Sequence, residues 1–427
     1  MKITRIHTTP IRIPLPRFFY NTENAGTKRE WGGRLSRITP RRPAPILEYV
    51  LVHIETDEGV VGLGEAPADI GFFGQTVEGI QVAVDDYLGP PLVGREPWDI
   101  PALMDRIDYR ENSSAKSGID LALHDLVAKA RGMTVSELLG GARRSRIPVA
   151  IEIAGGSPED MANECLKYLA MNVRAFKPKI GGVPEADAER LRAIRAAVGP
   201  DVSLRADANR GYSPEEAIEL CALAERYEIG LELLEQPCEF WDLPGMARVR
   251  GAVNIPIEAD ESCFGPYDAE AVVRAGAADV LNIKIAKAGG LCNAMKIAAI
   301  AREAGLRCVL GTAFGTGVKI AAKLHLAAAL DDFVGAVEFT EIGQHGPLLK
   351  GDLDRALALP LDADGCLPVP SGPGLGVELD EAKVADVAGL NPECSERGMR
   401  NAECGTAVGR PNAECRAAEA PNALNAD

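Results

Sequence analysis

Six charged residues from position 179 onward recur at a spacing that could bring their side chains to one place. In order, they are Lys179, Asp207, Glu235, Asp260, Lys284 and Glu338. The gaps between them are 28, 28, 25, 24 and 54 residues, and the last gap equals two steps of 27. A spacing near one strand-and-helix unit puts residues at the same end of successive parallel strands. We therefore expect all six side chains to converge on one mouth of a barrel.

Three of these residues are carboxylates on adjacent predicted strands, within RADANR, LLEQP and EADES. Such carboxylates would repel one another unless a cation lay between them. Neither histidine nor cysteine stands at these positions, and an all-oxygen site favours Mg²⁺ or Mn²⁺ over zinc. We predict Asp207, Glu235 and Asp260 as the metal ligands. Asn209 and Glu261, just beyond the first and third ligands, are expected to contact the ligands or the substrate.

Two lysines flank the predicted metal strands. Lys179 precedes the first ligand by one strand and Lys284 follows the last by one strand. Lys177 shares a strand face with Lys179, because residues two apart point the same way. Its charge and a nearby divalent cation should lower the pKa of Lys179, and a neutral amine near pH 7 is a suitable general base.

A divalent cation between two opposed lysines suits removal of a proton α to a carboxylate. The cation would stabilise the enediolate that forms when the proton leaves. One lysine would take the proton, while the other could return one to the opposite face, protonate a leaving group, or balance charge. Glu338, if protonated, could donate a hydrogen bond to the enediolate oxygen.

The elements that must position these residues are short apolar runs separated by helix-length segments. They begin at residue 146 and read IPVAIEIAG, AFKPKIGG, VSLRADANR, LELLEQP, IPIEADES, VLNIKIAKAGG, RCVLGTAFG and VGAVEFTEI. Eight such units predict a parallel α/β fold. Because no GxGxxG follows the first strand, a (β/α) TIM-type barrel at residues 146–345 is favoured over an open doubly wound sheet.

The segments around the barrel differ in pattern. Residues 1–140 alternate as strands and then show helical periodicity, which predicts an α+β domain. Residues 346–387 carry Pro and Gly turns and read as a closing segment that returns to the first domain. Residues 388–427 repeat NPEC, NAEC and NAEC without hydrophobic periodicity and are predicted to be disordered. Residues 18–45 form a basic loop, either a solvated surface segment or one that meets an anion.

The net charge of the chain limits the kinds of molecule that it is expected to bind. The 427 residues carry 46 Lys+Arg against 62 Asp+Glu, a net charge of −16, which argues against nucleic acid or anionic membrane as a partner. The start of the chain lacks a signal-peptide pattern and no run could span a bilayer, so we expect a cytoplasmic protein. Ten cysteines without a CxxC pair are typical of reduced packing residues rather than of a disulfide framework or zinc site.

These motifs resemble the enolase superfamily, and within it the mandelate racemase/muconate lactonizing enzyme group, muconate-lactonizing subgroup. The KxK motif appears as Lys177-Pro178-Lys179, and the opposite lysine is Lys284 within NIKIAKAGG. The acidic triad is Asp207, Glu235 and Asp260. The resemblance covers residues 1 to about 385, because SGIDLALHDLVAKARG is similar to the family's capping-domain helix. It implies that the α+β domain caps the barrel, that loops at 18–45 and 71–76 close the site, and that the chain forms a homo-oligomer.

Two departures bear on the subgroup. The seventh strand lacks the histidine of the mandelate-racemase subgroup, which disfavours a mandelate-type or sugar-acid dehydratase. The eighth strand reads EFTE at 338–341, where dipeptide epimerases of the family show DxD. Either Glu338 or Glu341 could therefore face the metal.

The predicted function is a racemase or epimerase of an amino-acid-derived carboxylate, with a small carboxylate as substrate. A muconate-type cycloisomerase or a syn-dehydratase uses the same frame, with only one lysine exchanging protons. A non-catalytic metabolite-binding barrel is a third hypothesis. A fourth interprets GTAFGTG, residues 311–317, as a phosphate-binding loop of an unrelated barrel.

Overall fold

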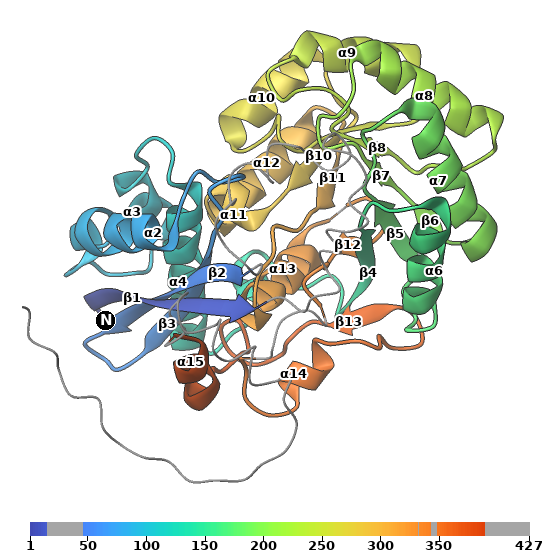
Figure 1. The fold of residues 1–427 in the computed structure, drawn as a ribbon. Helices are drawn as coiled ribbons and strands as arrows, with labels where there is room; N and C mark the ends of the chain where they lie inside the picture. The colour runs from blue at the N-terminus through green and yellow to red at the C-terminus, as the bar shows by residue number, and fades with distance from the viewer. Residues whose placement is uncertain (15–45, 332, 343–347, 389–427) are drawn as a thin grey trace, which may run out of the picture. The chain divides into compact units, whose positions relative to one another are not determined.

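The structure is a computed structural model that describes residues 1–14, 46–331, 333–342 and 348–388 (Figure 1). The predicted basic loop at 18–45 lies outside the described residues, as does the predicted disordered stretch apart from residue 388. No helix within the described ranges is long and apolar enough to cross a membrane.

An antiparallel sheet opens the chain. Strands β1 (Ile3–Pro14), β2 (Ile46–Thr56) and β3 (Val61–Ala68) pair in that order. Strand β3 lies so close to helix α4 (Ser113–Arg131) that a Cβ atom at Gly64 would stand 1.9 Å from the carbonyl oxygen of Gly118. The glycine therefore permits the contact between sheet and helix. The other helices of this region are α2 (Val77–Val82), the π-helix η2 (Ala83–Leu88), the 3₁₀ helix η3 (Pro90–Leu92), α3 (Ile100–Arg106) and α5 (Val135–Leu138).

A parallel (β/α) barrel follows. Its strands are β4 (Arg146–Ile153), β5 (Ala175–Pro178), β6 (Ser203–Leu204), β7 (Ala206–Asp207), β8 (Leu234–Glu235), β9 (Ile257–Ala259), β10 (Val280–Ile283), β11 (Arg307–Leu310) and β12 (Val337–Glu338). Buried Arg205 separates β6 from β7, so these two segments form the third of eight barrel strands. Strand β12 pairs in parallel with β4, which places the eighth strand beside the first.

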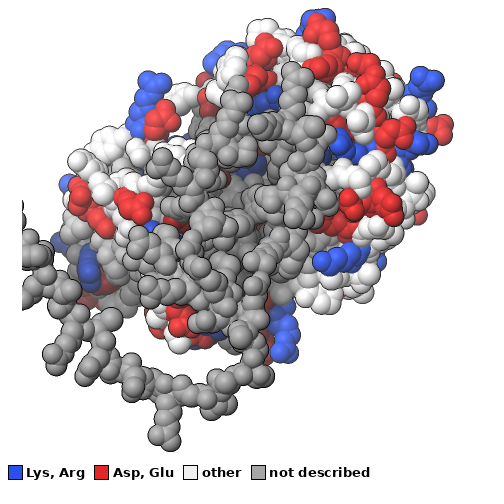
Figure 2. All heavy atoms as spheres, in the orientation of Figure 1, with Lys and Arg blue, Asp and Glu red and all other residues white. Residues whose placement is uncertain are grey.

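Helices alternate with these strands, as the spacing predicts. They are α6 (Pro158–Leu169), α7 (Pro184–Val198), α8 (Pro214–Arg226), α9 (Leu243–Ala252), α10 (Pro266–Ala275), α11 (Ile285–Ala288), α12 (Leu291–Glu303) and α13 (Gly317–Ala329). Proline stands in the first turn of α6 to α10, where its missing N–H costs no helical hydrogen bond. On the face shown in Figure 2, acidic side chains lie between the Lys and Arg side chains over α8 and α9. The Arg248–Glu215 ion pair, 2.5 Å long, joins these two helices.

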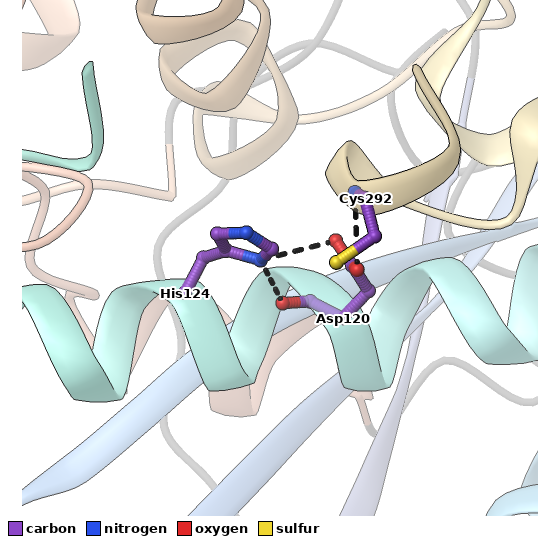
Figure 3. A group of neighbouring side chains, drawn as sticks. All are labelled: Asp120, His124 and Cys292. Atoms are coloured by element: carbon purple, nitrogen blue, oxygen red, sulfur yellow. Dashed lines mark hydrogen bonds and ion pairs between the residues drawn. The ribbon is translucent and has the colours of Figure 1, made fainter. Parts of the chain in front are cut away.

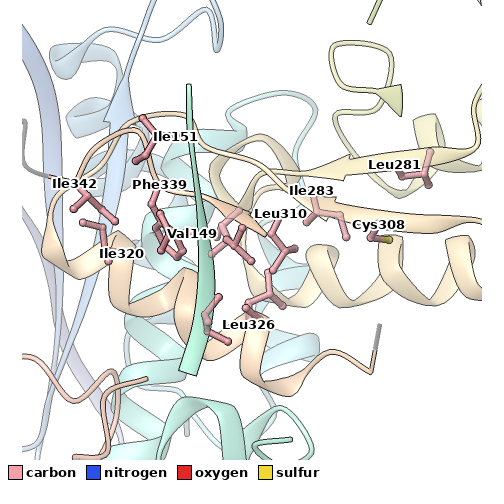
Figure 4. Close-up of a cluster of buried hydrophobic side chains, with 14 of the residues drawn as sticks. Val149, Ile151, Leu281, Ile283, Cys308, Leu310, Ile320, Leu326, Phe339 and Ile342 are labelled. Carbon is pink, nitrogen blue, oxygen red and sulfur yellow. The ribbon is translucent and has the colours of Figure 1, made fainter. Parts of the chain in front are cut away.

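Apolar side chains fill the space between the strands and helix α13. Val149 of β4 and Leu310 of β11 gather with Leu326 of α13 in one buried cluster (Figure 4). Cys308 lies in the same cluster and is 3% exposed. The seven cysteines among the described residues are all free, and five are buried. This agrees with their predicted packing role.

Two carboxylates of the N-terminal region cap barrel helices. Asp120 of α4 accepts hydrogen bonds from the backbone N–H groups of Leu291 and Cys292, at 2.5 and 3.3 Å, at the start of α12 (Figure 3). Glu65 of β3 accepts from the N–H of Thr316, at 2.9 Å, just before α13. These contacts fix the N-terminal region against the two helices that follow β10 and β11.

His124 and Asp120, both buried, form a group with the partly exposed Cys292, and the donor atoms of the three lie within 4.8 Å of one another. His124 Nδ1 stands 3.2 Å from the Asp120 carboxylate. Burial and the Asp120 charge both raise the pKa of Cys292, so its sulfur is a protonated thiol. Because the carboxylate also serves the N-terminus of α12, we assign this group a structural capping role.

The segment after the barrel contacts both regions. It contains α14 (Leu353–Ala356), β13 (Cys366–Pro368) and α15 (Glu381–Ala388). Strand β13 pairs antiparallel with β4, and α15 packs against β1. The N–H of Leu375 donates to Asp125 of α4 at 2.8 Å. The exact domain boundaries at 140, 146, 346 and 388 stay predictions.

Candidate active site

The predicted residues meet at one end of the barrel. Asp207, Glu235 and Glu338 end their strands, while Asp260 and Lys284 each follow a strand by one residue. These five side chains are buried, with Lys284 the most exposed at 5%. Parallel strands place their carboxyl ends together, which explains why residues so distant in sequence share this mouth.

Lys177 lies at the centre of the carboxylates. Its Nζ stands 2.8 Å from Glu235 Oε2, 2.6 Å from Glu338 Oε2 and 3.6 Å from Asp207 Oδ2. Burial disfavours its charge, but the surrounding carboxylates outweigh burial and raise the pKa of Lys177. Lys177 is therefore an ammonium ion that compensates several acids at once.

Lys179 lies closer to the mouth, with 14% of its side chain exposed. Its Nζ stands 2.6 Å from Asp207 Oδ2 and 3.0 Å from Oε1 of Glu152, which the sequence analysis did not single out. Burial and Lys177 both act to lower the pKa of Lys179, as predicted for Lys177, but Asp207 and Glu152 outweigh them. The prediction of a lowered pKa is therefore wrong for these contacts, because it considered neither the contact with Asp207 nor the one with Glu152.

The opposite lysine contacts the third carboxylate. Lys284 Nζ lies 2.6 Å from Asp260 Oδ2, and Lys287 Nζ lies 2.7 Å from Oδ1 of the same group. Lys287 also donates to the backbone oxygens of Asp260 and Asn282. Phe72 places its ring centroid 4.9 Å from Lys284 Nζ. The segment 71–76 therefore reaches the site, in line with its predicted role as a closing loop.

Glu338 rather than Glu341 faces the predicted metal ligands. Glu341 instead pairs with Lys323 of α13 at 2.8 Å and accepts a hydrogen bond from Thr312. Its carboxylate therefore belongs to the packing between β12 and α13.

The residues beyond the first and third ligands also meet. Asn209 donates its backbone N–H to Asp207 Oδ1 at 2.9 Å, and its side chain donates to Glu261 at 3.4 Å. Asn209 and Arg210 have φ values of +41° and +68°. This left-handed backbone costs conformational free energy in residues other than glycine, and it turns the chain toward the carboxylates. Burial and the neighbouring acids raise the pKa of Glu261 to about 7.

The loop GTAFGTG does not offer a phosphate site. Glu65 already accepts a hydrogen bond from the N–H of Thr316, and Lys319 Nζ donates to the carbonyl oxygens of Ala313 and Phe314. A carboxylate at this helix start would repel a phosphate.

Comparison with known proteins identifies the family. Residues 42–140 match the mandelate racemase/muconate lactonizing enzyme N-terminal domain, and residues 160–383 match the enolase C-terminal domain-like family. The chain belongs to the enolase superfamily, in its mandelate racemase/muconate lactonizing enzyme group. Within that group it is 38% identical to an L-Ala-D/L-Glu epimerase of Clostridium acetobutylicum, over 77% of this chain and 90% of the relative.

Two further relatives correspond to the two predicted activities, one to a cycloisomerase and one to an epimerase. A chloromuconate cycloisomerase of Cupriavidus pinatubonensis is 34% identical, over 82% of this chain and 93% of its own. The crystal structure of a dipeptide epimerase from Enterococcus faecalis, complexed with Mg and the dipeptide L-Leu-L-Tyr, aligns with a TM-score of 0.76 and 31% identity. That alignment covers 88% of this chain and all of the other. The family membership supports an isomerase with this (β/α) barrel and capping domain.

Sequence reasoning did not single out three residues of this superfamily site, although one of them, Phe72, lies in the predicted closing loop at 71–76. Glu152 is a single acid inside the apolar run IPVAIEIAG, where period-two alternation would have placed it on the same face as Ala150. Lys287 follows Lys284 by one helical turn, a spacing that could have signalled it. The residue type of Phe72 does not mark it as a site residue, because an aromatic residue in a loop is most often a packing residue.

Proposed function

We propose that this protein is a racemase or epimerase that removes and returns the proton α to the carboxylate of an amino-acid-derived substrate. The placement of the two lysines carries the proposal. Lys179 follows β5 and Lys284 follows β10, which are the second and sixth of the eight barrel strands. They therefore stand across the barrel from each other, one on each side of the three acidic strands.

The acidic residues fit a divalent cation. Asp207, Glu235 and Asp260 are buried, lie on adjacent strands, and have lysine ammonium groups within 2.8 Å as counter-charges. All-oxygen ligation of this kind suits Mg²⁺, with Mn²⁺ as a substitute, and the Enterococcus faecalis relative contains Mg. A bound cation would stabilise the negative charge that develops on the substrate carboxylate.

The chain's own residues divide the remaining tasks. Lys179 takes the α-proton from one face as the free amine, which requires that a bound cation engage Asp207 and so remove the contact that most raises the pKa of Lys179. Lys284 supplies a proton to the other face as the ammonium ion. Lys177, held between Glu235 and Glu338, stays charged and balances the enediolate. Phe72 covers Lys284 and limits access of water to it.

Solvent exchange tests the proposal. The protein is incubated with Mg²⁺ in D₂O with free, N-alkylated and N-acylated amino acids and with unsaturated carboxylates, and the α-hydrogens are followed by NMR. We expect deuterium at Cα and formation of the other enantiomer. A lactone or an alkene without such exchange would favour the second candidate, a cycloisomerase or syn-dehydratase, which the Cupriavidus relative supports.

The metal requirement has a separate test. Mn²⁺ binding, measured by electron paramagnetic resonance, should weaken by about 100-fold or more in Glu235→Gln, because the variant removes one ligand charge. Addition of a chelator should stop α-proton exchange in the unmodified protein. Exchange that continued in chelator would contradict the proposed cation. The cytoplasmic location and the homo-oligomeric state stay predictions.

A further inference from the structure

Glu152 is a charged group at the site that the proposed mechanism does not use. It lies near the end of β4, the first barrel strand, and its backbone N–H donates to Thr340 Oγ1 at 3.4 Å. Oε1 faces the ammonium groups of Lys179 and Lys177, at 3.0 and 3.2 Å. Within the described part of the chain, these two lysines are its ion-pair partners, and 13% of the side chain stays exposed at the mouth.

The position of Glu152 restricts what it can meet on a substrate. A base that takes the α-proton brings its nitrogen to about 3 to 3.5 Å from Cα. The carboxylate of Glu152 is 3.0 Å from that nitrogen, so it lies close to the other substituents of Cα. The predicted metal ligands are on β7, β8 and just after β9, whereas Glu152 is on β4, on the other side of β5.

The substrate carboxylate must turn toward the metal ligands, so another substituent of Cα faces β4. An apolar side chain or a neutral amide there would leave Lys177 as the one ion-pair partner of Glu152 among the described residues when Lys179 is the free amine. A cationic nitrogen would instead form a charge-assisted hydrogen bond or a close ion pair with it. Burial opposes ionisation of Glu152, but Lys179 and Lys177 outweigh it and hold its pKa below the usual range.

We propose that Glu152 binds a cationic nitrogen attached to the α-carbon, so that the substrate is an amino acid with a free or N-alkylated amine rather than an N-acylated one. This inference rests on the proposed α-proton transfer. It makes Glu152 a specificity-determining residue of a site in which Lys179 and Lys284 move the proton. It also assigns a substrate class that the name of no relative above supplies.

Matched substrate series test the inference. One side chain is offered as the free amino acid, the N-methyl and N-trimethyl derivatives, and the N-acetyl derivative, and kcat/KM is measured for enantiomer interconversion. In Glu152→Gln we expect a loss of about 10- to 100-fold for the cationic member that the unmodified protein prefers, and little further loss for the N-acetyl member. Glu152→Asp keeps the charge and should recover most of the loss. Glu159→Gln, an exposed acid seven residues away, is the matched control.

The outcomes separate this inference from the proposed function. Equal losses for cationic and N-acetyl substrates would show that Glu152 serves only Lys177 and Lys179, and would overturn the inference. A preference of the unmodified protein for N-acetyl substrates would also overturn it while leaving α-proton transfer intact. Absence of exchange with every substrate would reject the proposed function itself. Mn²⁺ binding of Glu152→Gln, measured in parallel, verifies that the variant is folded.

Discussion

At the scale of residues, charge and burial explain most of the site. Carboxylate oxygens lie 2.6 to 3.6 Å from Lys177 Nζ, and these counter-charges explain how an interior strand can carry an ammonium group. The types and spacing of the triad and the lysines were sufficient to predict their convergence. The sign of the pKa shift of Lys179 was predicted wrongly, because the prediction weighed Lys177 and a cation but not the contacts of Lys179 with Asp207 and Glu152. Glu152 precedes Lys179 by 27 residues, a spacing like that of the other site residues, so extending the series by one step toward the N-terminus would have found it.

Glu341 provides a test of the assignment on β12. Glu341→Gln removes the charge that pairs with buried Lys323, so the free energy of unfolding should fall by about 3 kcal/mol, measured by urea denaturation. Mn²⁺ affinity should not change, in contrast to its loss in Glu235→Gln. Glu378→Gln, in an exposed ion pair with Lys350, is the matched control and should change stability little. Loss of Mn²⁺ binding in Glu341→Gln would place Glu341 at the metal instead.

At the scale of elements, the eight strand-and-helix units and the N-terminal α+β region follow from hydrophobic periodicity and turn residues. The burial of Arg205 between β6 and β7 does not, because the partners of its guanidinium, Glu232 and the carbonyl oxygen of Val334, come together only in the fold. The capping of α12 and α13 by carboxylates of the N-terminal region was equally hidden. Asp120 and Asp125 sit inside one helical pattern, and only the fold shows which distant N–H groups they accept.

The contact between α4 and α12 predicts a localised loss of stability. Asp120→Ala leaves the N–H groups of Leu291 and Cys292 without their acceptor, and we expect a loss of about 2 kcal/mol in unfolding free energy. Amide hydrogen exchange should accelerate specifically in the first turn of α12. Asp99→Ala, which removes an exposed cap of α3, should accelerate exchange only in α3. Unchanged protection of α12 in Asp120→Ala would contradict the capping role.

At the scale of the whole molecule, the closing segment ties the N-terminal region to the barrel. His325 of α13 accepts from the N–H of Ser136 at Nδ1 and donates from Nε2 to the carbonyl oxygen of Leu375, at 3.4 and 3.1 Å. The contact at Nδ1 requires the neutral ring, because a protonated Nδ1 could not accept the Ser136 N–H. One uncharged histidine thus joins a barrel helix, the start of α5 and the closing segment, which the residue type alone could not have indicated.

This histidine predicts a pH dependence of stability. Burial lowers the pKa of His325 to about 4, below its value near 6.5 in the unfolded chain. Its contribution is therefore complete above pH 6.5 and is lost as the pH falls toward 4, by up to about 3 kcal/mol. His53, lowered to about 4 by burial and by His7, acts in the same direction. The pKa of His124 is raised instead, so its contribution to stability is lost as the pH rises above 6.5.

Urea denaturation between pH 7 and pH 4.5 measures this slope. The unfolding free energy of His325→Gln should depend less steeply on pH than that of the unmodified protein, whatever its absolute stability. An equal slope in the two proteins would mean that His325 does not bind its proton differently on folding.

The central claim is that two lysines on opposite strands each serve one face of the same carbon. The most direct measurement is α-proton exchange in D₂O for each enantiomer of a turned-over substrate, in Lys179→Ala and Lys284→Ala. Each variant should lose interconversion, and each should retain exchange of one enantiomer only, the opposite one in the two variants. If either variant still exchanged both enantiomers, or if both lost exchange of the same enantiomer alone, the two-base account would be contradicted.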